Sequence, residues 1–92
     1  MPKSWVYDPT ISHYDALLFY NAMKKHYDPF YYTPIAVAKR EEIGMRYRFL
    51  CIAHDRYAPE QASLFAKIEI YKPMEGMPYA TFLRRLEPDT WQ

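Results

Sequence analysis

The chain has 92 residues, and its 12 lysines and arginines nearly balance 11 aspartates and glutamates, which leaves a net charge of +1. Half of the residues are hydrophobic and 18% are aromatic, a composition that excludes a disordered chain. No apolar run approaches the roughly 18 residues of a membrane span, and the single cysteine, Cys51, excludes a disulfide scaffold. The length predicts one domain over residues 1–92.

The first residues carry no apolar stretch of the kind found in signal peptides. A lone thiol suits a reducing compartment. We therefore expect a cytoplasmic protein.

The first half of the chain predicts a helix between two extended segments. Residues 3–7 read as a short strand. Ser12, followed by Asp15, resembles a capping box, and apolar residues then recur at helical spacing up to Asp28 and Pro29, which predicts a helix over 13–27. A strand is expected over 34–41.

The second half predicts two strands and a second helix. Residues 42–44 read as a hairpin turn in which Gly44 supplies a positive φ, and alternation predicts strands over 46–54 and 62–72. Tyr79, Phe82, Leu83 and Leu86 follow at helical spacing. The expected fold class is α+β: a small antiparallel sheet of three to four strands packed against an N-terminal helix, with a short C-terminal helix.

Residues 44–53 read Gly-Met-Arg-Tyr-Arg-Phe-Leu-Cys-Ile-Ala, and residues 78–82 read Pro-Tyr-Ala-Thr-Phe. Over about residues 40–86 the chain resembles a small bacterial family, domain of unknown function 1653, with its Gly-x-x-Tyr-x-Val-Leu-x-Ile-Ala opening and later Pro-x-x-x-Phe segment. The family's arginine before that proline is Met77 here. The resemblance implies a compact β-rich bacterial domain and no particular activity.

Residues that could carry catalysis are sparse. Cys51 lies between Leu50 and Ile52 and reads as a buried small hydrophobe rather than a nucleophile. The three histidines have no known zinc spacing, and two distant glycines cannot form a phosphate loop. We therefore expect no enzyme, no metal and no cofactor.

Ten tyrosines are the distinctive feature of the composition. A core of this size cannot enclose all of them, so several are expected at the surface, where tyrosine is typical of recognition sites. We single out the cluster of Tyr27, Phe30, Tyr31 and Tyr32. Its aromatic side chains suit either recognition of a partner or packing at the edge of the core.

A basic set accompanies the predicted hairpin, and its members are Lys39, Arg40, Arg46, Arg48 and Arg56. On a strand, Arg46 and Arg48 share one face. A sheet face that combines basic and aromatic side chains can bind single-stranded nucleic acid. The interleaved Glu41, Glu42 and Asp55 and the net charge of only +1 favour an ordinary solvated face instead, since a dedicated nucleic-acid binder is usually more basic.

Two functions follow as hypotheses. The first is a non-catalytic module that binds another protein, or a second copy of itself as a homodimer, through exposed aromatics, as an accessory or inhibitor protein of a phage or mobile element would. The second is binding of a nucleotide or single-stranded nucleic acid on the basic hairpin face. No membrane partner is expected.

Overall fold

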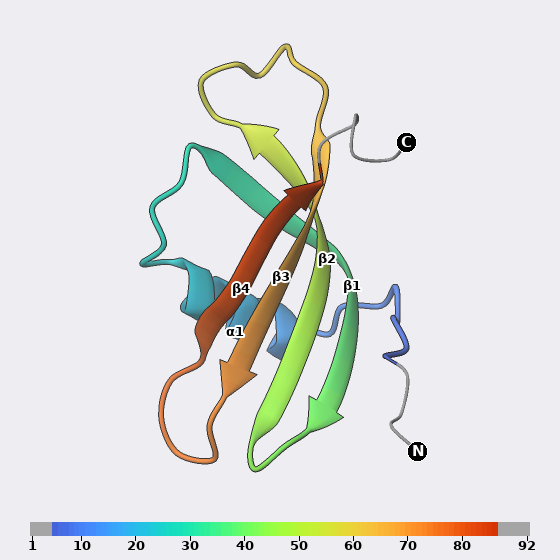
Figure 1. Ribbon diagram of the computed structural model, residues 1–92, viewed down its shortest axis with the longest axis vertical. Helices are drawn as coiled ribbons and strands as arrows, with labels where there is room; N and C mark the ends of the chain where they lie inside the picture. The colour runs from blue at the N-terminus through green and yellow to red at the C-terminus, as the bar shows by residue number, and fades with distance from the viewer. Residues whose placement is uncertain (1–4, 87–92) are drawn as a thin grey trace.

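The computed structural model describes residues 5–86 and has an α+β architecture of one helix and one four-stranded antiparallel sheet. The strands lie in the sheet in chain order, each beside the next (Figure 1). In order, the elements are α1 (His13–Met23), β1 (Phe30–Glu41), β2 (Met45–Asp55), β3 (Leu64–Lys72) and β4 (Tyr79–Leu86). The part of the predicted strand 3–7 that is described contains no strand.

Helix α1 begins where the sequence predicted and ends earlier. The Ser12 hydroxyl accepts a hydrogen bond from the Asp15 N–H at 3.1 Å, which confirms the N-cap. The helix ends at Met23 rather than at residue 27, and the Lys24 N–H closes its last turn on the Tyr20 carbonyl. The basic residues that follow Met23 therefore lie in the connection to β1.

Strand β1 begins at Phe30, four residues before the predicted start, because the strand continues through Pro34 instead of starting there. The pairing with β2 shifts register between Pro34 and Ala36. A proline is tolerated at an irregularity of an edge strand, where its missing N–H costs no regular ladder bond. The turn after β1 is as predicted, with a φ of 111° at Gly44.

The predicted C-terminal helix is wrong: residues 79–86 form strand β4. The pairing of β3 with β4 shifts between Ile70, opposite Ala80, and Glu69, opposite Phe82. The extra residue, Thr81, is a bulge that puts Tyr79 and Phe82 on the same face although they are three positions apart. A bulged strand thus imitates helical spacing.

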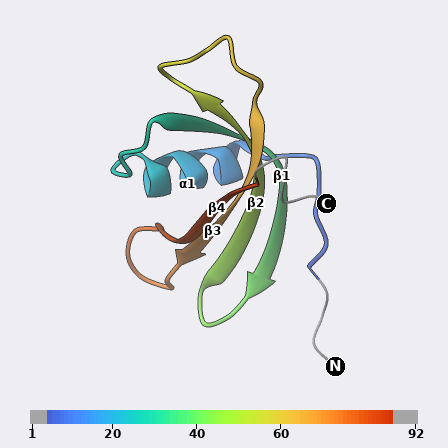
Figure 2. The same ribbon diagram turned by 45° about the horizontal axis from the view of Figure 1, so that its top comes forward.

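The two faces of the sheet have different surroundings. Figure 2 shows α1 on one side and the segment that precedes it on the other. On the helix side, the Phe19 ring lies 4.9 Å from the Phe49 ring, and the buried core collects there. Strands β1 and β4 approach each other around this side, since Arg85 of β4 contacts Asp28, two residues before β1, at 3.2 Å.

Candidate functional site

The sheet face that turns away from α1, here called the outer face, carries most of the basic and aromatic strand residues. Cross-strand pairing arranges its side chains in successive rows: Tyr31 with His54; Thr33, Ile52, Phe65 and Leu86; Ala36, Leu50, Lys67 and Arg84; Ala38, Arg48, Glu69 and Phe82; Arg40, Arg46, Tyr71 and Tyr79. Cationic side chains outnumber carboxylates on this face although the whole chain is nearly neutral.

The predicted aromatic cluster does not form one surface. Alternation along β1 places Tyr31 on the outer face, where its ring stacks on His54 at 5.0 Å. Phe30 and Tyr32 point to the other side and pack against the core. Tyr27 precedes the strand, is 86% exposed, and shares a hydrogen bond of 3.3 Å with the Tyr57 hydroxyl.

Tyr32 belongs to a polar cluster that lies between the two edge strands of the sheet, β1 and β4. Its hydroxyl donates to the Asp28 carboxylate at 2.7 Å and accepts from Arg85 at 3.0 Å. Burial, followed by the bond to Asp28, raises the pKa of Tyr32 to about 12. Burial alone would raise the pKa of Asp28, but hydrogen bonds from Phe30, Tyr32 and His26 outweigh it and lower that pKa. This cluster links β1 to β4.

Arg46 and Arg48 share the outer face as predicted, and both bind Glu69. Arg46 contacts one carboxylate oxygen at 2.8 Å and Arg48 the other at 2.9 Å. Burial opposes ionisation of Glu69, but these hydrogen bonds outweigh it and lower its pKa. Among the predicted basic residues, Lys39 departs from this face: it pairs with Tyr47 on the helix side and binds Asp15.

Lys67 and Arg84, here called the basic pair, are directly opposite each other on β3 and β4. Both side chains are exposed, and within residues 5–86 neither forms an ion pair. Like charges at opposed cross-strand positions destabilise a sheet. The basic pair is therefore a place where a bound anion would relieve repulsion.

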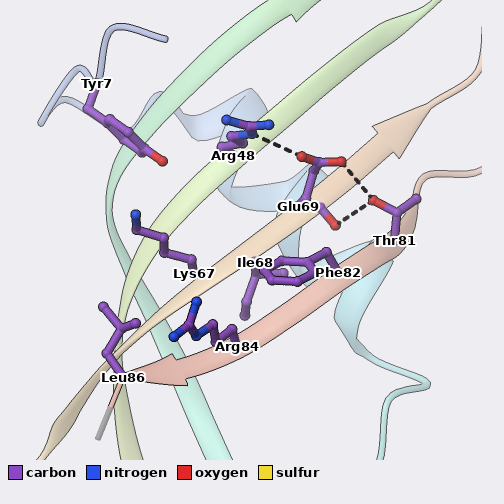
Figure 3. Close-up of a pocket in the computed structure, with 9 residues that line it drawn as sticks. All are labelled: Tyr7, Arg48, Lys67, Ile68, Glu69, Thr81, Phe82, Arg84 and Leu86. Atoms are coloured by element: carbon purple, nitrogen blue, oxygen red, sulfur yellow. Dashed lines mark hydrogen bonds and ion pairs between the residues drawn. The ribbon is translucent and has the colours of Figure 1, made fainter. Parts of the chain in front are cut away.

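A groove of about 550 Å³ lies over the basic pair. Figure 3 shows Tyr7 at one side of it and Phe82 at the other, with Lys67 between them and the Arg48–Glu69 ion pair beside Phe82. Thr81 donates to Glu69 from the β4 side at 3.2 Å. Phe82 is 51% exposed and Tyr7 is 37% exposed, so both rings are accessible. The groove thus combines cationic side chains with aromatic walls.

Groups that could support catalysis are placed as follows. Cys51 is fully buried, and burial raises the pKa of its thiol to about 12, so it stays protonated at neutral pH. His54 bonds Ser63 at 2.9 Å, and His26 bonds Asp28 at 3.1 Å. In the described part of the chain, no three histidine, cysteine or carboxylate side chains converge as metal ligands would, and no helix there is long and apolar enough to cross a membrane.

Sequence reasoning missed the basic pair and the two rings beside it. Lys67 lies on the strand that alternation predicts over residues 62–72, but its neighbour Arg84 was assigned to the predicted C-terminal helix. A strand assignment for residues 79–86 would have placed Arg84 and Phe82 on a sheet. The position of Tyr7 depends on the path of the chain before α1 and has no local signal.

Comparison with known proteins adds no relative: no family model, no curated protein and no solved structure matches the chain. The resemblance of residues 40–86 to the domain of unknown function 1653 family therefore stays a prediction.

Proposed function

We propose that the protein is a non-catalytic module that binds single-stranded nucleic acid on the outer face of its sheet. The observation that carries the proposal is the basic pair, two opposed cations without a carboxylate partner among the described residues, at the floor of a groove with aromatic walls. Phosphate groups suit the cations, and exposed rings suit unpaired bases.

The rows of the face support a single strand over a duplex. Phe82 lies one row after the basic pair. Adjacent rows are two residues apart, about 6.7 Å along a strand, so a phosphate on the basic pair leaves a neighbouring base within reach of the Phe82 ring. In a duplex these base faces are covered by stacking, and the rings would have nothing to bind.

The test is a titration of a fluorescein-labelled oligothymidylate with the protein, followed by fluorescence anisotropy at low salt. The Lys67→Ala/Arg84→Ala double variant is expected to lose at least tenfold in affinity, since each phosphate contact contributes a large share of non-specific binding. The matched control, Lys24→Ala/Lys25→Ala, removes the same charge from exposed positions after α1 and should bind as the wild type does.

Two results would contradict the proposal: no binding of the oligonucleotide at low salt, or equal losses in the two double variants. Tighter binding to a duplex of the same length would contradict the single-strand assignment alone.

A second candidate function, binding of a protein partner, is favoured by the outward side of α1. Tyr14, Leu17 and Tyr20 are 62%, 48% and 63% exposed there. Exposed tyrosines beside an apolar residue are typical of interface anchors. If a second copy of the chain is that partner, light scattering will give a dimer mass for the wild type and a monomer mass for Tyr14→Ser/Leu17→Ser; a monomer mass for both would rule out the homodimer.

A further inference from the structure

Residues 5–8, here called the N-terminal strap, lie on the outer face beside β1. Asp8 holds the strap through two backbone hydrogen bonds with Val37, of 2.8 and 2.9 Å. The Trp5 ring lies 4.1 Å from the Arg48 guanidinium carbon and 4.8 Å from that of Arg40. A residue outside any regular strand thus places an indole on two arginines.

The outer face is covered beside that indole. Ala36 and Ala38 belong to an edge strand and point to the outer face, yet they are only 9% and 1% exposed. Another part of the chain therefore covers these small side chains, and the N-terminal strap passes on this side (Figure 2). Ala38 lies directly opposite Arg48, one of the two arginines under Trp5.

The two arginines under Trp5 differ from the basic pair because each of them forms an ion pair with a carboxylate. Arg48 binds Glu69 at 2.9 Å, and Arg40 binds Glu42 at 2.6 Å. These contacts occupy the edges of the guanidinium groups, where hydrogen-bond donors lie, and leave their planar faces available for stacking. Neutralised guanidiniums are poor phosphate ligands but good platforms for an aromatic ring.

We propose that Arg40 and Arg48 form a stacking subsite for a nucleobase, and that Trp5 occupies this subsite in the free protein. The inference rests on the proposed nucleic-acid binding and adds its regulation: a strand that uses the whole face must first displace the indole. The subsite adjoins the basic pair, because the row of Arg48 follows the row of Lys67 and Arg84. Trp5 thus competes with the bound nucleobase for the same subsite.

The experiment compares the wild type with Trp5→Ala in oligothymidylate titrations. Removal of the competing Trp5 indole should lower the dissociation constant about three- to tenfold, because one or two exposed cation–π contacts shift an equilibrium by about that factor. Val6→Ala is the control, because Val6 belongs to the same segment and is 79% exposed; it should bind as the wild type does.

A second readout follows Trp5 itself in a Trp91→Phe background, which leaves one tryptophan in the chain. Addition of the oligonucleotide should shift Trp5 emission to longer wavelength and increase its quenching by acrylamide, as expected for an indole released to water. Arg48→Gln should increase the same quenching without any oligonucleotide.

The outcomes separate the two proposals. Oligonucleotide binding that Trp5→Ala weakens or leaves unchanged would overturn the subsite while nucleic-acid binding stands, and so would emission of Trp5 that shifts to shorter wavelength on binding. Absence of binding by both proteins would overturn the proposed function and, with it, the nucleobase subsite.

Discussion

At the scale of single residues, the contact between Asp15 and Lys39 joins the helix to the sheet. Asp15 is only 2% exposed, and its carboxylate lies 2.7 Å from the Lys39 ammonium group. A buried carboxylate that loses its cation is strongly destabilising. The pair therefore adds an ionic contact to the apolar packing of Leu18 and Phe19, by which α1 also lies on the sheet.

We expect Lys39→Met to lower the free energy of unfolding by about 2–3 kcal/mol, less than the largest cost of a broken buried pair because the Lys39 side chain is 44% exposed. Urea denaturation measures this change. Lys25→Met, at an exposed position, should change stability by less than about 0.5 kcal/mol. Equal stability of Lys39→Met and the wild type would show that the pair does not stabilise the fold.

Two tyrosines give the protein a predicted alkaline transition. Burial raises the pKa of Tyr47 to about 12, and burial with the Asp28 contact raises that of Tyr32 to about 12. Unfolded, both titrate near 10. The folded state therefore keeps protons that the unfolded state has lost, and the free energy of unfolding should fall as pH rises from 10 towards 12.

Denaturation measured between pH 9 and 11.5 tests this transition. Tyr32→Phe and Tyr47→Phe should each reduce the slope of stability against pH, because neither side chain can then ionise. Tyr20→Phe, with a ring that is 63% exposed, should keep the wild-type slope. A slope that is the same in all the variants would contradict the assignment.

At the scale of elements, local pattern predicts those strands whose pairing is regular. Alternation over residues 46–54 and 62–72 places the right side chains on each face of β2 and β3. Strand β4 was missed because the bulge at Thr81 breaks its alternation, and the start of β1 because Pro34 signalled a break. Both irregularities are set by pairing with a neighbouring strand, which local sequence does not contain.

The two glycines give a matched test of the loops that join these strands. Gly44 and Gly76 both have positive φ values, 111° and 119°. A Cβ at Gly44 would lie 2.5 Å from the Lys72 carbonyl oxygen, whereas at Gly76 the nearest atom, in the Pro73 ring, is 3.5 Å away. Backbone strain is common to both sites, and the steric clash is specific to Gly44.

We therefore expect Gly76→Ala to cost about 1–2 kcal/mol, the price of a strained backbone alone. Gly44→Ala should cost clearly more, since strand β3 must also shift where it ends at Lys72. Thermal or urea unfolding of the two variants measures the difference. Equal losses would mean that the close approach at Gly44 is relieved without cost.

At the scale of the whole molecule, the fold separates charges that the sequence mixes. The net charge is only +1, which argued against a nucleic-acid binder. Folding pairs Lys39 with Asp15 and Arg85 with Asp28 on the helix side, and leaves the basic pair on the outer face. Net charge therefore underestimates how basic one face can be.

The prediction that tyrosines remain at the surface is confirmed, but they do not form one recognition patch. Tyr14 and Tyr20 lie on α1, Tyr27 and Tyr57 on connections, and Tyr31 and Tyr79 on the outer face. The sequence shows that there are more tyrosines than the core can enclose, whereas strand pairing decides which of them lie together at the surface. This is why the basic pair and its aromatic walls, rather than the tyrosine-rich segment, carry the proposed function.

The most direct test of that function is the salt dependence of oligonucleotide binding. For a single strand, log K falls against log salt concentration with a slope of about −0.7 per phosphate contact, so loss of both cations in Lys67→Ala/Arg84→Ala should reduce the slope by about 1.4. Lys24→Ala/Lys25→Ala should leave it unchanged. A slope that is the same in the wild type and in both double variants would contradict the account.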